Sequence, residues 1–80
     1  MTRARVHVTL KPSVFDPQGK TVHDALASLG YAAVAGVRQG KFFELDVDLP
    51  ADAAQALVAE IAARVLSNPV IESFRVEVLP

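Results

Sequence analysis

The side chains that could perform chemistry are few in this chain, and their spacing does not bring them together. The two histidines, His7 and His23, belong to different predicted elements, and the sequence contains no cysteine. A protein zinc site needs three or four ligands at matched spacing, so we expect no metal ligand. Asp46 and Asp48 share one face of a predicted strand. Carboxylates there are usually solvated, or paired with a cation of a neighbouring strand such as Arg5.

Motifs for nucleophilic catalysis and for phosphate binding are also missing from the sequence. No serine lies in a Gly-x-Ser-x-Gly motif between a strand and a helix. Gly36 and Gly40 bracket a predicted hairpin, whereas a phosphate-binding loop must open a helix. The sequence therefore predicts no catalytic residue and no cofactor-binding residue, and we expect the protein to act by binding other molecules.

The composition excludes further kinds of partner. The chain has 80 residues, of which 51% are hydrophobic, and a formal net charge of −1. This length holds one hydrophobic core, so we expect a single domain over residues 1–80. Eight Lys and Arg residues are interspersed with nine acidic residues, whereas a nucleic-acid surface needs clustered cations. No segment has the length and apolar character of a membrane span. We therefore expect a cytoplasmic protein that binds neither nucleic acid nor membranes.

Hydrophobic periodicity predicts four strands and two helices. Segments of alternating polarity indicate strands, and apolar stripes at three- and four-residue spacing indicate helices. Gln39-Gly40 is predicted to be a two-residue hairpin loop in which glycine takes a positive φ. The first helix begins at Asp16, just before a proline, or alternatively at Thr21, and it stops at Gly30. In chain order we expect a strand over 6–10, this helix, strands over 34–39 and 41–49, a helix over 53–66 and a strand over 70–79.

This β-α-β-β-α-β order with short connections predicts an α+β fold, the ferredoxin-like split βαβ sandwich. In it an antiparallel four-stranded sheet carries both helices on one face. The open face would alternate in charge, so it could be solvated or could pair with its own copy around a two-fold axis. Many unrelated functions share the topology, including amino-acid-binding regulatory domains of the ACT type. The predicted open face consists of Arg5, His7, Thr9, Arg38, Phe42, Glu44, Asp46, Arg75 and Glu77.

Three segments contain residues that folding alone does not require: 16–19, 36–42 and 68–75. In the first, Gly19 would cost about 1 kcal/mol relative to alanine in a helix, which indicates either close approach of another group or a frayed helix start. These segments, in this order and at this spacing, resemble the PurS family, the small subunit of phosphoribosylformylglycinamidine synthase. The resemblance runs from Val6 to Glu77, and the alanine-rich segment 31–35 departs from it. Its most specific parts are SVFDPQG at 13–19, VRQGK at 37–41 and NPVIE at 68–72.

The resemblance implies a subunit without an active site. In this family, PurS dimers hold together the synthetase PurL, which uses ATP on formylglycinamide ribonucleotide, and the glutaminase PurQ, which releases ammonia from glutamine. The resemblance further implies that the chain binds no cofactor, that the assembled complex uses ATP and Mg, and that the chain forms a homodimer or a dimer of dimers. An ACT-like domain that senses a small molecule remains the alternative. We expect partner contacts at Asp16, Pro17, Gln18, Gly19, Arg38, Gly40 and Lys41.

Overall fold

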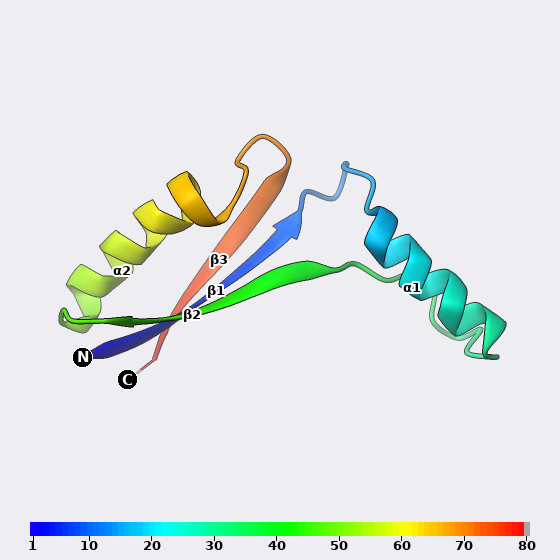
Figure 1. Ribbon diagram of the computed structural model, residues 1–80, viewed down its shortest axis with the longest axis horizontal. Coiled ribbons are helices and arrows are strands. Elements are labelled where there is room, and N and C mark those ends of the chain that lie inside the picture. Colours follow the sequence, from blue (N-terminus) through cyan, green and yellow to red (C-terminus); the bar gives the residue numbers. More distant parts are fainter. Residues whose placement is uncertain (80) are drawn as a thin grey trace.

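Figure 1 shows the computed structural model of the chain, which describes residues 1–79. This part of the chain contains a small sheet, one helix that packs against the sheet and one helix that stands apart from it. In chain order the elements are β1 (Thr2–Leu10), α1 (Pro17–Ser28), β2 (Gly40–Val47), α2 (Ala51–Ile61), the π-helical turn η1 (Ala62–Leu66) and β3 (Glu72–Leu79).

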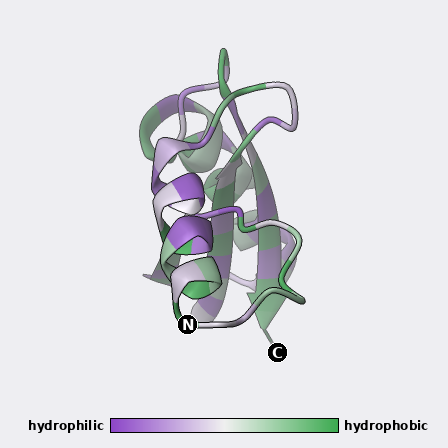
Figure 2. Cartoon of the chain, turned by 90° about the vertical axis from the view of Figure 1, so that its right-hand side faces the viewer, coloured by the Kyte–Doolittle hydropathy of each residue, from purple (hydrophilic) through white to green (hydrophobic). Residues whose placement is uncertain are grey.

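The sheet is antiparallel with the strand order β2-β1-β3, so β1 is central. Alternation along β1 gives the sheet two unlike faces, because Ala4, Val6 and Val8 are fully buried while the residues between them face the other way. Helix α2 packs on the buried face, over β1 and β3, and its Val58 is fully buried there. Figure 2 shows the resulting bands of hydrophobic and hydrophilic residues along the strands. The core lies between this face and α2.

The predicted four-stranded sheet is wrong: within residues 1–79 the sheet has three strands, and residues 34–39 form none of them. The prediction depended on a hairpin turn with Gly40 in the left-handed region. In the described chain the glycine with a positive φ is Gly30, at 95°, and Gly40 is the first residue of β2. A Cβ atom at Gly40 would collide with the carbonyl oxygen of Val8. This glycine therefore lets β2 lie close to β1 and does not make a turn.

The prediction that both helices cover one face of the sheet is also wrong, because α1 projects away from the sheet (Figure 1). Residues 29–39 return along α1, and the Nε2 atom of His23 lies 3.1 Å from the Val34 carbonyl oxygen. We call residues 17–39 the arm. The radius of gyration is 15.8 Å, compared with about 12 Å for a compact domain of this length. The arm is therefore held mainly through its base and does not fold back onto the sheet.

Helix α1 begins and ends where the sequence predicts. Asp16 is its N-cap, with a carboxylate oxygen that accepts a hydrogen bond from the Gly19 N–H at 2.9 Å, and Pro17 is the first helical residue. The alternative start at Thr21 is wrong. Gly30 follows the helix in the left-handed conformation, which glycine adopts at little cost.

The second predicted helix, over 53–66, corresponds to α2 together with η1. The backbone N–H and the hydroxyl of Ser67 both donate to the Ala62 carbonyl oxygen, at 3.0 and 2.8 Å, and these bonds close the wider final turn. Among residues 1–79, no helix has the length and apolar character needed to cross a membrane.

Candidate functional site

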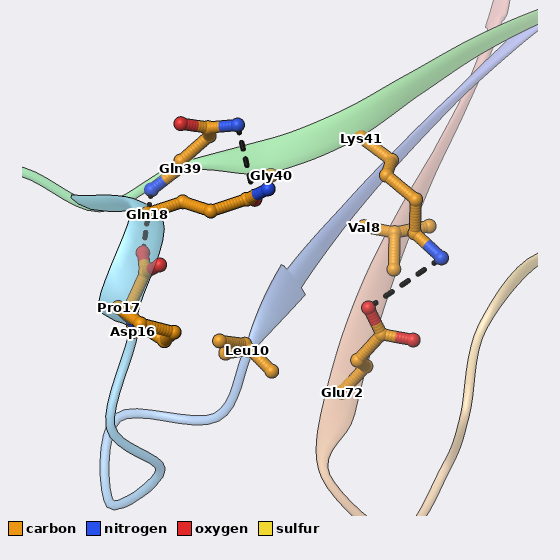
Figure 3. A pocket seen from close by; sticks show the side chains of 9 residues that line it. All are labelled: Val8, Leu10, Asp16, Pro17, Gln18, Gln39, Gly40, Lys41 and Glu72. Atoms are coloured by element: carbon orange, nitrogen blue, oxygen red, sulfur yellow. Dashed lines mark hydrogen bonds and ion pairs between the residues drawn. The ribbon is translucent and has the colours of Figure 1, made fainter. Parts of the chain in front are cut away.

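Most of the residues that the sequence marks as partner-binding candidates meet where the arm joins the sheet. Five of the seven line one cavity of about 440 Å³ in the angle between the arm and the sheet (Figure 3). Gly19 is buried next to this cavity, and Arg38 lines two neighbouring hollows instead. The cavity is lined by Val8, Leu10, Asp16, Pro17, Gln18, Gln39, Gly40, Lys41 and Glu72.

Asp16 is the buried charge at this site, with an exposed fraction of 5%. Besides capping α1, its carboxylate accepts a second hydrogen bond, from the Gln39 backbone N–H at 2.8 Å. The hydrogen bonds from Gln39 and Gly19, in that order, lower the pKa of Asp16 below its ordinary value, and the nearby positive charge of Arg38 lowers the pKa further. One ionised carboxylate thus joins the start of the arm to its end.

Gly19 lets the two ends of the arm lie this close together. A Cβ atom at this position would lie 2.5 Å from the Val37 carbonyl oxygen and 2.6 Å from a carboxylate oxygen of Asp16. Both distances are far shorter than a van der Waals contact. The close approach predicted from the sequence is therefore confirmed, and the approaching group is the return segment of the arm itself.

Two further side chains close the base of the arm. The Arg38 guanidinium donates to the carbonyl oxygens of Lys11 and Leu10, at 2.9 and 3.3 Å. The Gln39 side-chain amide donates to the Gln18 side chain at 3.1 Å. These bonds join the end of β1 and the first turn of α1 to the segment before β2. We call Asp16, Gly19, Arg38 and Gln39 the clasp, because together they set the direction in which the arm leaves the sheet.

Lys41 faces the cavity from β2 and connects it to the chain after α2. Its ammonium lies 3.6 Å from a Glu72 carboxylate oxygen and donates to the Leu66 carbonyl oxygen at 3.2 Å. Glu72, whose side chain is 14% exposed, also accepts a hydrogen bond from the Asn68 N–H at 2.7 Å. The segments 13–19, 37–41 and 68–72, far apart in the sequence, therefore contribute side chains to one site.

Comparisons with known proteins identify the family to which the chain belongs. Residues 3–80 match the family model described as PurS, phosphoribosylformylglycinamidine (FGAM) synthase. The chain belongs to the PurS family. It is 43% identical over 76 residues to the PurS subunit of this synthase from Mycobacterium leprae, covering 95% of the chain and 94% of the relative. It is 44% identical over 78 residues to the PurS subunit from Bacillus subtilis, covering 98% and 93%.

Solved PurS structures have the same shape as this chain. B. subtilis PurS superposes with a TM-score of 0.89 at 42% identity and covers the whole of both chains. Methanocaldococcus jannaschii PurS superposes with a TM-score of 0.90 at 30% identity, over 99% of this chain and 96% of that chain. A chain of the Thermotoga maritima PurLQS structure superposes with a TM-score of 0.81 at 26% identity, over 98% and 96%. Because the coverage includes the arm, the extended shape is a property of the PurS fold.

The buried or partly buried carboxylates of this site are already hydrogen-bonded or ion-paired within the chain, so the site fixes the geometry of the arm. The carboxylate of Asp16 is occupied by two backbone N–H groups, and the Glu72 carboxylate by Lys41 and a backbone N–H. Within residues 1–79, no group of three or more His, Cys, Asp or Glu side chains is placed to hold a metal ion. The family match confirms the resemblance found in the sequence, and it does not favour the ACT-like alternative.

Sequence reasoning missed part of this site. The sequence predicts a hairpin loop at Gln39, whereas its backbone N–H is the donor that closes the clasp. The sequence predicts only that Glu72 belongs to a strand over 70–79, and nothing in its pattern indicates that Glu72 lies 3.6 Å from Lys41. The signal was present, since both residues lie in the three segments that carry the family resemblance. Contact with a partner by the seven candidates stays a prediction.

Proposed function

We propose that this chain is the non-catalytic subunit that bridges the synthetase PurL and the glutaminase PurQ in FGAM synthase. The complex is an ATP-dependent carbon–nitrogen ligase of de novo purine biosynthesis. It converts formylglycinamide ribonucleotide to formylglycinamidine ribonucleotide with glutamine as the source of ammonia. The observation that carries the proposal is the clasped arm, which a self-contained domain would not need. Family membership and the likeness to a chain of T. maritima PurLQS also support it.

We further propose that two copies associate through their arms, as a homodimer or a dimer of dimers. The arm exposes large apolar side chains, among them Val22, Leu29 and Tyr31. The body exposes another group near the start of β3, including Val70 and Ile71. A two-fold arrangement in which each arm covers the body of the other copy would bury both groups, and burial of apolar area drives association. A lone subunit with this shape would leave both groups in water.

Bridging has a physical purpose in this reaction. Ammonia is mostly protonated in neutral water and is then no longer a nucleophile, so a closed path between the two active sites preserves it. Holding the two enzymes together also raises their effective concentration. The proposal assigns ATP and Mg to the assembled complex and no cofactor to this chain, which acts as one PurS-like domain over residues 1–80 in the cytoplasm.

The proposal is tested by kinetics with purified PurL and PurQ from the same organism. Adding the chain should raise glutamine-dependent formation of the amidine while hardly changing the ammonia-dependent rate, because free ammonia needs no path between subunits. The three proteins should also co-elute on a sizing column. An unchanged glutamine-dependent rate, with no co-elution, would show that the chain is not the bridge.

A further inference from the structure

We call the sheet face opposite α2 the outer face. One region of it carries a positive charge that no acidic side chain compensates. Along most of this face the charges are compensated across the strands. Arg5 lies 3.1 Å from Glu44 and 3.7 Å from Glu77, and Arg3 lies 3.2 Å from Asp46. These partly exposed pairs form a solvated, charge-balanced surface.

The next row of the outer face differs from the charge-balanced part. In the cross-strand register, Phe42, His7 and Arg75 lie side by side. The rings of Phe42 and His7 are 5.1 Å apart, and Phe42 is 54% exposed. None of the ion pairs within residues 1–79 includes Arg75, which is exposed. This row therefore presents an uncompensated positive charge on β3 and an exposed aromatic ring on β2, with His7 of β1 between them.

The outer face ends beyond this row in a hollow of about 440 Å³, lined by Thr9, Leu10, Pro12, Arg38 and Ser73. Thr9 and Ser73 are directly opposite each other in the register. They lie two residues from the row of Arg75, which is about 7 Å along the strands. The hollow has hydroxyl groups, a guanidinium and no carboxylate among its lining side chains. The Arg38 guanidinium is anchored there by two carbonyl oxygens.

We propose that this hollow and the adjacent row form a docking surface for an acidic segment of a partner subunit of the synthase. A carboxylate of that segment binds between Arg38 and Arg75, and the hydroxyls of Thr9 and Ser73 can donate to it. A neighbouring apolar side chain of the same segment packs on Phe42. The inference rests on the proposed bridging function, because that function supplies the partner.

Three observations select an acidic protein segment as the occupant. Arg75 makes no ion pair within residues 1–79 and favours a negative charge, and a planar guanidinium binds a carboxylate well. Arg38, whose charge also acts on Asp16, adds a second guanidinium at the hollow. The row also combines an exposed aromatic ring with an arginine on the same face, and both residue types are enriched in protein interfaces. The region is also an open hollow continued by a flat row, which suits a side chain carried by a protein surface better than an enclosed small molecule.

The test uses three variants of the full chain. Arg75→Glu reverses the uncompensated charge, and Phe42→Ala removes the apolar contact. Arg64→Glu is the charge-reversal control, because Arg64 is also exposed and lies on η1, outside the outer face; its exposed ion pair with Glu60 at 3.2 Å contributes little to stability. Affinity for purified PurL and PurQ is measured at two salt concentrations, and the mass of the isolated chain is measured by ultracentrifugation. Inorganic phosphate is titrated into the isolated chain.

We expect Arg75→Glu to weaken assembly with the partner tenfold or more, and Phe42→Ala to weaken it about fivefold, in line with an interface anchor. The loss with Arg75→Glu should be accompanied by a flatter salt dependence. Arg64→Glu should assemble as the wild type does, and all variants should keep the self-associated mass of the wild type.

The other outcomes overturn the proposal in distinguishable ways. If the wild type binds its partners and Arg75→Glu binds them equally well, the outer face is not the docking surface while bridging stands. If Arg75→Glu loses self-association instead, the face joins copies of this chain. If phosphate binds the isolated chain in an Arg75-dependent way and assembly is unaffected, the hollow is a small-anion site. If the wild type itself does not assemble, the bridging function fails, and this inference fails with it.

Discussion

Replacing Gly19 by alanine places a methyl group at the point where the two ends of the arm meet. In an exposed helix this substitution would stabilise the chain by about 1 kcal/mol, because alanine has the higher helix propensity. In this fold the new Cβ would lie 2.5 Å from the Val37 carbonyl oxygen and 2.6 Å from a carboxylate oxygen of Asp16. Local propensity and tertiary packing therefore predict effects of opposite sign.

The structure indicates that packing outweighs propensity. Inserting a methyl group into a filled space costs about 1–3 kcal/mol. The cost should be near the upper end, because the carbonyl of Val37 is followed directly by Arg38 and Gln39, which are both hydrogen-bonded in the clasp. After subtracting the gain in propensity, we expect a net loss of about 2 kcal/mol. This loss is roughly a thirtyfold change in the folding equilibrium and lowers the melting temperature of a domain of this size by about 8–16 °C.

The assay is urea denaturation at one fixed protein concentration, because self-association makes the apparent stability depend on concentration. Gly36→Ala is the matched control, since a Cβ atom there has nothing within 4 Å and the glycine does not have a positive φ. We expect the control to be neutral or to gain up to about 1 kcal/mol. If Gly19→Ala is as stable as Gly36→Ala, the close approach that defines the clasp does not exist in solution.

Two further predictions concern the charge of Asp16 and the exposed surface of the arm. The pKa of Asp16 is below its ordinary value of 3.8 in the folded chain, so its contribution to stability is complete above that value and is lost as the pH falls through the lowered pKa. The urea midpoint of Asp16→Asn should therefore fall less than that of the wild type between pH 5 and about pH 2, and parallel curves would contradict the assigned role. Leu29→Asp puts a charge on the exposed apolar surface of the arm. It should weaken self-association tenfold or more in sedimentation experiments without loss of helix content, and an unchanged dissociation constant would remove the arm from the interface.

The features that the sequence predicts correctly depend on neighbours along the chain. The alternation from Val6 to Leu10 predicts a strand with one buried face because successive side chains of a strand point to opposite sides. The boundaries of α1 follow from Asp16 and Gly30, since capping and the left-handed stop involve groups only a few residues apart. The sequence also predicts a cation of the first strand beside Asp46. The structure places Arg3 there, whereas Arg5, the cation expected at this position, pairs with Glu44 because the register differs by two residues.

The features that the sequence predicts wrongly depend on distant groups. Gly40 has two uses that look alike in a sequence, a turn and a close approach, and the position of the Val8 carbonyl decides between them. Residues 34–39 have the composition of a strand, but they lie along α1 and have no sheet neighbour in the described chain. The projection of α1 could not be predicted from its apolar stripe, because such a stripe shows that a surface becomes buried and does not show against which molecule.

The candidate site contains side chains that the sequence identifies and backbone groups that only the fold brings to them. The sequence alone singles out Asp16, Gly19, Arg38 and Lys41, because they lie in segments that folding does not fully explain and that carry the family resemblance. The sequence could not predict how these residues are arranged, because the clasp is completed by backbone groups: the Gln39 N–H and the carbonyl oxygens of Leu10 and Lys11. Every residue type carries these backbone groups, so no side-chain pattern marks them. Only the path of the chain in three dimensions decides which of them meet a charged side chain.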